Sequence, residues 1–347
     1  MTKIITIGSA TMDVFVECDE ANIVSVCSKN RNADFMSYPY GSKIDISTFA
    51  SNVGGGGINT ACNFGNLGFD TQAIFKIGDD FYADGILNFL KNQKINLNSI
   101  IKKEDVSTGF SVILVSFQGD RTVLAHRGAN SNIQEDEINF DAIKCSDLVY
   151  IAPLNGDSNR ILDKIINCAE EGNTKICFNA GTTTIKKGFE HLNGILSSAH
   201  VVVMNKEEAS LATGITVRPD TKTEKYSHDV IHRDIKIMLE KLKIKEYQVI
   251  VITDGSKGAY AYEGKNFYFC PTYPSEVIST LGAGDAFAST FCATLFKYGT
   301  DIGRALMFAS VNSASVVSKF GATEGLLTFK EIEQRLKDYS SYTYLLG

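Results

Sequence analysis

A short glycine turn that ends in a carboxylate is the stretch of this sequence best suited to chemistry. Residues 281–287 are Leu-Gly-Ala-Gly-Asp-Ala-Phe, and the apolar run after Asp285 predicts a helix that begins at the turn. Because Gly282 and Gly284 lack a β-carbon, the backbone N–H groups, including that of Ala283, can face an anion at the positive end of the helix. Asp285, expected to be ionised there, could then accept a hydroxyl proton. The stretch predicts phosphoryl transfer, although an ordinary loop with Asp285 as a helix cap is an alternative.

A second glycine cluster occurs near the N-terminus. Residues 54–57 are four glycines, followed by Ile58, Asn59 and residues that predict a helix capped at Gly68 and then a strand over 71–77. A backbone without side chains can approach a ligand closely, and Asn59 offers an amide beside it. A flexible tether is the alternative, but a tether seldom leads straight into a capped helix.

Alternating apolar segments predict the elements that position these residues. Apolar strands alternate with amphipathic helices, which is typical of a mainly parallel sheet covered on both faces. Ligands of such sheets gather at the carboxyl ends of the strands, where Asp13, Asn205 and residues 253–255 are expected. The expected strands are 148–152, 175–179, 200–205 and 248–253, with helices such as 159–171 and 207–213 between them.

Two regions interrupt this alternation. Residues 14–50 and 107–127 have short alternating strand patterns and no neighbouring helix, and the second region turns at residues 118–120. They could form either a separate small β-sheet or an extra edge of the main sheet. The stretch 217–227 is expected to be a mobile insertion.

The ordered motifs resemble the ribokinase family of carbohydrate kinases, also called the PfkB family, over nearly the whole chain. The resemblance implies one ribokinase-like α/β domain over residues 1–347, with the segments 14–50 and 107–127 as a β lid over a sugar. It also implies ATP and Mg²⁺ as donor and cofactor, and sometimes a homodimer through the lid. The motifs are an early strand ending in Asp13, GG-x-G-x-N at 54–59, N-x-x-E at 205–208, T-x-G-x-x-G at 253–258 and GAGD at 282–285.

The same resemblance assigns roles to individual residues. Asp285 would be the base, and the amides of Gly282, Ala283 and Gly284 would form an anion hole. Glu208 would act on Mg²⁺ through water, although Asn205 and Glu208 also have the spacing of a helix N-cap with a first-turn acid. The residues expected on the nucleotide side are Asn205, Thr253, Gly255, Gly258 and Asn312. The residues expected on the acceptor side are Asp13, Gly55, Gly56, Asn59 and Asn155.

Several positions depart from the family pattern. Gly56 stands where ribokinases usually have Lys, and Ile58 where they usually have Ala, which is closer to the phosphosugar-kinase branch. Asn155 stands near the usual place of a sugar-binding Glu. Ser279 replaces the Asp that usually helps to bind an activating monovalent cation, so activation by K⁺ is expected to be weak or absent. The identity of the acceptor therefore stays open.

Composition narrows the class of protein. The chain has 347 residues with ordinary apolar and charged content, a net charge of −6 and a pI near 5.5. An acidic chain without a basic patch disfavours nucleic acid and membrane surfaces as partners. Without a signal peptide or C-x-x-C pair, the chain is expected to be cytoplasmic with reduced core cysteines. His228 and His232 have the spacing of a metal pair but lie in a charged stretch without a third ligand, so a solvated helix face is favoured.

These observations predict an ATP-dependent kinase that phosphorylates a primary hydroxyl of a small sugar, like a ribokinase or fructokinase. A nucleoside kinase of the same family is the first alternative. A non-catalytic sugar- or nucleotide-binding protein is the second. Neither a Walker A sequence nor G-x-G-x-x-G is present, which disfavours a nicotinamide dehydrogenase.

Overall fold

The computed structural model describes residues 2–19, 21–27, 32–93, 95–116, 121–218, 232–337 and 344–346. The expected turn at 118–120, most of the expected insertion at 217–227 and His228 lie outside these ranges. Within them, no helix combines the length and apolar character needed to cross a membrane.

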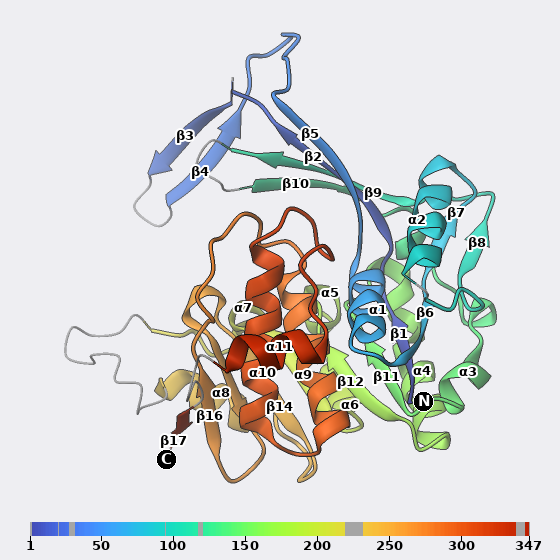
Figure 1. Cartoon of the computed structure of the whole chain (residues 1–347), viewed down its shortest axis with the longest axis vertical. Helices are drawn as coiled ribbons and strands as arrows, with labels where there is room; N and C mark the ends of the chain where they lie inside the picture. The colour runs from blue at the N-terminus through green and yellow to red at the C-terminus, as the bar shows by residue number, and fades with distance from the viewer. Residues whose placement is uncertain are drawn as a thin grey trace.

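A mainly parallel sheet forms the centre of the molecule (Figure 1). Its strands are continuous apolar runs because helices cover both faces. The strands pair in the order β17-β16-β15-β14-β13-β12-β11-β1-β6, and β14 to β6 are parallel whereas β15, β16 and β17 are antiparallel. Their bounds are β1 Lys3–Ile7, β6 Asp70–Ile74, β11 Leu148–Ile151, β12 Lys175–Asn179, β13 Val201–Asn205, β14 Val249–Thr253, β15 Ala259–Tyr262, β16 Phe267–Cys270 and β17 Tyr344–Leu346.

Helices pack on the two faces of this sheet because successive strand residues point to opposite sides. In β1, Ile5 and Ile7 belong to the core shared with α3, α4, α6, α7 and α8, whereas Ile4 belongs to the core shared with α1, α9, α10 and α11. The helices are α1 Gly56–Asn66, α2 Phe81–Asn92, α3 Phe140–Lys144, α4 Leu162–Glu171, α5 Thr182–Ile185, α6 Phe189–Leu196, α7 Lys206–Thr213, α8 Arg233–Leu242, α9 Ala283–Tyr298, α10 Ile302–Val317 and α11 Phe329–Leu336.

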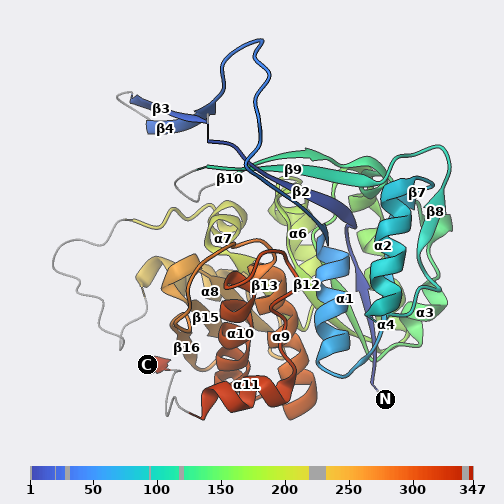
Figure 2. The ribbon, with the colours of Figure 1, turned by 45° about the horizontal axis from the view of Figure 1, so that its top comes forward.

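The two interrupting regions form separate sheets, not an edge of the central one. One sheet has the strand order β10-β9-β2-β5, and β3 and β4 make a hairpin that projects from the rest of the molecule (Figures 1 and 2). The bounds are β2 Thr11–Glu17, β3 Asn22–Cys27, β4 Asn32–Ser37, β5 Thr48–Gly54, β9 Gly109–Val115 and β10 Arg121–His126. We call these six strands the lid strands.

Some expected elements differ in detail. The strand expected over 71–77 is two strands, β6 and β7 (Lys76–Gly78), because the chain leaves the central sheet after Ile74 and β7 pairs with β8 (Ile101–Lys103). Asp13 does not end a strand of the central sheet, since β1 stops at Ile7 and Asp13 lies inside β2. The eight cysteines are all free, and Cys27 and Cys145 are the exposed ones.

Candidate active site

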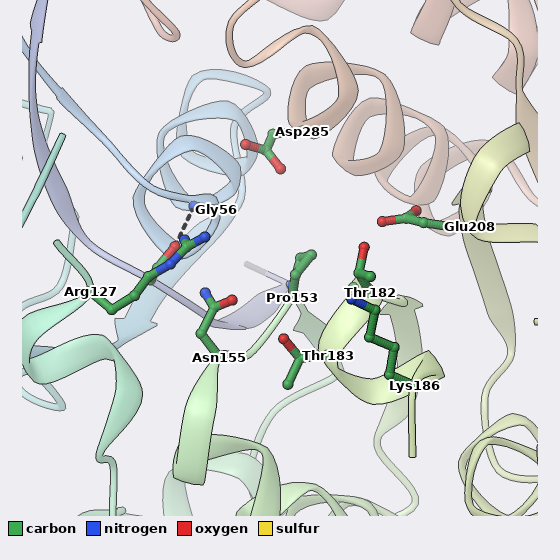
Figure 3. A pocket seen from close by; sticks show the side chains of 11 residues that line it. Gly56, Arg127, Pro153, Asn155, Thr182, Thr183, Lys186, Glu208 and Asp285 are labelled. Carbon is green, nitrogen blue, oxygen red and sulfur yellow. Dashed lines mark hydrogen bonds between the residues drawn. The ribbon is translucent and has the colours of Figure 1, made fainter. Parts of the chain in front are cut away.

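Two cavities meet at the start of α9. The first has a volume of about 480 Å³ and includes Asp285 in its wall (Figure 3). The second has a volume of about 460 Å³ and includes Ala283 and Gly284. The predicted turn therefore separates two spaces of ligand size, with its carboxylate facing one and its backbone facing the other.

The turn has the geometry expected of an anion site. Gly282 is the N-cap of α9, in the left-handed conformation with φ 75°, and no side chain caps this helix. The N–H of Ala283 makes only a long bond of 3.4 Å to Thr280 O. A 16-residue helix with uncapped first-turn N–H groups presents a positive end to an anion.

The base candidate is held by an amide from a distant part of the chain. Asn59 Nδ2 donates to Asp285 Oδ2 at 2.8 Å, which joins α1 to α9 across 226 positions of the sequence. Burial raises the pKa of Asp285 above its usual value, and the Asn59 bond partly opposes this effect. A carboxylate with a raised pKa is a better proton acceptor near neutral pH.

Asn59 also keeps one atom without a partner. Its side chain is 6% exposed, and its Oδ1 has no hydrogen-bond partner. An orphaned buried oxygen costs free energy, and Asn59 lines neither of the two cavities.

In the glycine cluster at 54–57, Gly55 and Gly57 pack against backbone, whereas Gly54 and Gly56 face side chains. A β-carbon at Gly55, whose φ is 98°, would lie 2.5 Å from Ser9 O, so this glycine permits close packing of two loops and does not line the cavity. Gly56 does line it, and a β-carbon there would lie 3.6 Å from Asp285 Oδ1. Of the two glycines expected on the acceptor side, the structure brings Gly56 to the cavity wall.

Glu208 faces the first cavity from the start of α7. Its Oε2 accepts the N–H of Asn205 at 3.1 Å, and Asn205 Oδ1 accepts the N–H of Glu208 at 2.8 Å, so the capping box is formed. Burial raises the pKa of Glu208 to about 7, an effect that Glu207 reinforces and the Asn205 bond opposes. A desolvated carboxylate with no cation partner among the described residues suits a hydrated Mg²⁺. Asn205 itself lines neither cavity.

Asp13 is buried in β2 and lines neither cavity. It is 6% exposed, and burial raises its pKa while bonds from Ser111 and Thr11 lower it. A β-carbon at Gly54 would lie 2.2 Å from Asp13 Oδ2, so the glycine makes room for this carboxylate. Asn155, by contrast, lies directly on the cavity.

The second cavity brings together most of the residues expected on the nucleotide side. Thr253, Gly255 and Gly258 line it, at and just after the carboxyl end of β14. The other walls are apolar or carry small hydroxyls, which suits a flat base with a ribose. They include Tyr273, Val277, Phe287, Ser310, Ser313, Ala314 and Val317.

The structure corrects the expectation that Asn312 lies on the nucleotide side, because Asn312 does not line this cavity. It is fully buried on the other side of α10, where Nδ2 donates to Asn63 Oδ1 at 2.9 Å and to Thr290 Oγ1 at 2.8 Å. Its Oδ1 accepts the N–H of Leu327 at 2.9 Å. Its amide therefore joins helices and leaves no group for a nucleotide.

Five polar residues of the first cavity were missed by the motif analysis. One of them, Ser9, follows the carboxyl end of β1. Thr182 and Thr183 follow the carboxyl end of β12, so the rule that ligands gather there would have found them. Arg127 and Lys186 follow β10 and α5 and belong to no motif. Only the folded chain places them at the cavity.

Comparison with known proteins gives consistent matches. A family model described as pfkB family carbohydrate kinase matches residues 1–328. A ribokinase of Staphylococcus aureus (strain COL) is 29% identical over 283 residues, which are 81% of this chain and 87% of that protein. The structure of Arabidopsis thaliana ribokinase with ribose and ATP has a TM-score of 0.75 at 20% identity, covering 97% of this chain and 99% of that one. A Methanocaldococcus jannaschii nucleoside kinase has a TM-score of 0.73 at 21% identity, covering 98% and 99%.

Proposed function

Because the chain belongs to the pfkB family of carbohydrate kinases, we propose that it transfers the γ-phosphate of ATP to a primary hydroxyl of a small sugar. The observation that carries the proposal is the position of the turn at residues 282–285 between two cavities. A donor in the second cavity and an acceptor in the first would meet at the positive end of α9.

Each part of the turn has a role in this transfer. Asp285 accepts the proton of the acceptor hydroxyl while that oxygen forms a bond to the γ-phosphorus and the bond to the β-phosphate oxygen breaks. The amides of Gly282, Ala283 and Gly284 face the charge that develops on the transferred group. Asn59 orients the Asp285 carboxylate through its 2.8 Å bond.

The remaining roles follow from position. Asn155, which lines the first cavity, contacts acceptor hydroxyls. Asp13, Asn59, Gly55 and Gly56 support that side of the site. On the donor side, Thr253, Gly255 and Gly258 contact the nucleotide. Glu208 would hold Mg²⁺ through water, with Asn205 fixing its carboxylate, and the ion would neutralise phosphate charge.

An assay of ADP release tests the function. Purified protein with ATP and Mg²⁺ is presented with sugars, sugar phosphates and nucleosides, and ADP release that depends on one sugar is expected. Preference for adenosine, inosine or cytidine would identify a nucleoside kinase instead. Ligand binding without ADP release would identify a non-catalytic binding protein.

Glu208 gives a prediction about pH. The folded pKa of about 7 exceeds the usual 4.5, so the folded protein binds more protons and loses stability as pH rises between these values. The Glu208→Gln variant does not lose stability in this way as pH rises, and its amide oxygen can still accept the N–H of Asn205. Without nucleotide or divalent ion, the free energy of unfolding of the variant should rise relative to that of the wild type by about 1–2 kcal/mol between pH 5 and pH 7. This value is reduced because Glu208 is partly exposed. Denaturant unfolding at several pH values measures it.

The advantage of the Glu208→Gln variant should level off above about pH 7, since both states are then ionised in the wild type. Glu207→Gln, at the neighbouring exposed position, removes only the charge that reinforces the shift, so its pH-dependent gain over wild type should be much smaller than that of Glu208→Gln. A constant difference between wild type and Glu208→Gln across the range would show that this carboxyl titrates normally.

Activation by K⁺ is expected to be weak or absent. Ser279 is 8% exposed, offers a neutral hydroxyl, and accepts the N–H of Leu281 at 3.3 Å. A carboxylate at this position would attract a hard cation more strongly. The rate at fixed ionic strength, with K⁺ exchanged for a bulky organic cation, should change by less than about tenfold. A larger rise on restoring K⁺ would contradict this expectation.

We also infer a homodimer through the lid strands. They expose large apolar side chains that the monomer leaves uncovered, including Val24 (47%), Phe35 (54%), Phe49 (64%) and Leu124 (55%). Sedimentation velocity should show a dimer, and Val24→Lys with Phe35→Lys should convert it to a monomer. Leu211→Lys, 50% exposed on α7, is the control. A monomeric wild type at micromolar concentration would contradict the dimer.

The free cysteines support a reducing compartment, which agrees with the cytoplasmic location proposed from the sequence.

A further inference from the structure

An ion pair joins the start of α7 to the loop that follows β14. The strands β13 and β14 are parallel neighbours, and Asn205 pairs with Thr253 at their carboxyl ends. The residue that follows each of them is charged, and Lys206 Nζ donates a hydrogen bond to Asp254 Oδ1. The register of the two strands therefore places this pair at the edge of the sheet where the proposed site lies.

The position of Lys206 is not explained by its own helix. Lys206 is the first residue of α7, and the positive end of a helix repels a cation. Glu207 and Glu208, in the same turn, follow the usual preference for acidic residues at this end. A residue that breaks a local rule has a cause outside its own element. Here the ammonium group of Lys206 reaches the carboxylate of Asp254.

The shape of the loop does not require the carboxylate of Asp254. This residue is the N-cap of the short 3₁₀ helix Gly255–Lys257, but its side chain makes no capping hydrogen bond. The backbone forms the turn instead. The N–H of Asp254 donates to Gly258 O at 2.8 Å, and the N–H of Lys257 donates to Asp254 O at 3.0 Å. The charge at position 254 therefore needs another explanation.

The carboxylate of Asp254 lies beside the cavity proposed for the donor nucleotide. Thr253 and Gly255, the residues on either side of Asp254 in the chain, line the second cavity. The side chain of Asp254 is 10% exposed and that of Lys206 is 23% exposed. A poorly hydrated carboxylate repels a polyphosphate more strongly than an exposed one does, because less water screens the two charges. Without a cation beside it, Asp254 would oppose the binding of ATP.

We propose that Lys206 cancels the charge of Asp254, and that this neutralisation lets the second cavity bind a polyphosphate donor. The inference rests on the proposed function and adds a residue that sets the affinity for the donor. Lys206 acts through Asp254 and does not touch the phosphates. The affinity for a nucleotide therefore depends on the net charge of the pair and on the number of phosphates that the nucleotide carries.

Calorimetric titration of the full chain with ATP, ADP and AMP tests the inference, with a chelator present and no acceptor. The three ligands share a base and a ribose and differ in phosphate charge. Lys206→Gln leaves the charge of Asp254 uncompensated. We expect this variant to bind ATP at least about tenfold more weakly than the wild type, with a smaller loss for ADP and the smallest loss for AMP. The losses should shrink as the salt concentration rises.

Two further variants separate charge from shape. Asp254→Asn removes the negative charge, so it should bind ATP at least as tightly as the wild type does. The double variant Lys206→Gln/Asp254→Asn is neutral at both positions, and its two amides can still form a hydrogen bond. Its affinity for ATP should therefore return to within about threefold of the wild-type value.

Lys144→Gln is the matched control. It removes the same charge from another ion pair, between Lys144 and Glu171, and neither of these residues lines a cavity. This variant should bind all three nucleotides as the wild type does. In steady-state kinetics, Lys206→Gln should raise the KM for ATP and leave kcat and the KM for the acceptor within about threefold of wild type.

The outcomes separate this inference from the proposed function. Equal losses for ATP, ADP and AMP in Lys206→Gln would show that the pair only shapes the loop, and the inference would be wrong. If the double variant binds ATP as weakly as Lys206→Gln does, the ammonium group contacts the phosphates itself, and the inference is also wrong. Wild-type affinity for ATP in Lys206→Gln would contradict it directly. The expected nucleotide binding without ADP release for any acceptor would refute the kinase proposal alone, whereas a wild-type protein that binds no nucleotide would refute both.

Discussion

Asp285→Asn should lower turnover by about 10²–10⁴, the usual contribution of a positioned general base. The asparagine has the same shape, and its oxygen can still accept the Asn59 Nδ2 bond that measures 2.8 Å in the wild type. It cannot accept a proton, so the chemical step loses its base while both cavities keep their form. Turnover with saturating ATP and acceptor, under conditions where chemistry is rate-limiting, measures the loss.

The wild-type pH profile belongs to the same experiment. Because burial raises the pKa of Asp285, kcat should fall with decreasing pH earlier than an exposed aspartate would allow. Asp163→Asn, at an exposed position of α4, is the control and should keep wild-type turnover. ATP binding and the melting temperature should be unchanged in both variants. An Asp285→Asn enzyme that keeps a third of wild-type turnover would exclude Asp285 as the base.

Local patterns were sufficient for most strands of the central sheet and for the turn before α9. Runs such as Val201–Met204 predict buried parallel strands because both faces of each strand are covered. The spacing of Asn205 and Glu208 predicts the capping box that the structure contains. In these cases the physical cause lies within a few residues, so the sequence shows it directly.

Long-range placement could not be predicted in the same way. The contact between Asn59 and Asp285 depends on two helices packing together, and Arg127 reaches the cavity only because β10 runs beside β9. Asn312 shows the limit of assigning a side chain by motif order alone. Ser310, Ser313 and Val317 line the cavity at helical spacing, and a residue two positions after Ser310 faces away from it.

Gly282→Ala should damage both folding and catalysis, because position 282 has no room for a side chain. Its φ of 75° is unfavourable for alanine, and a β-carbon there would lie 2.6 Å from Ala322 Cβ and 2.8 Å from Ala322 O. The backbone must move, so we expect a loss of about 2–4 kcal/mol in the free energy of unfolding. A displacement of about 1 Å at the base would lower turnover roughly 10²-fold.

Gly284→Ala is the matched comparison two residues later in the same turn. A β-carbon there meets nothing within 4 Å, and the residue lies in the first turn of α9. Its stability should equal or exceed that of the wild type, since alanine favours a helix over glycine by up to about 1 kcal/mol. The added methyl group would project into open space beside the second cavity, so the KM for ATP should rise instead. Chemical unfolding and steady-state kinetics of both variants separate the two effects, and wild-type stability and turnover in Gly282→Ala would refute the strain argument. In that case position 282 would tolerate a side chain. In the expected result, Gly282 is needed for the backbone shape of the turn, and Gly284 is needed to leave space for the phosphates.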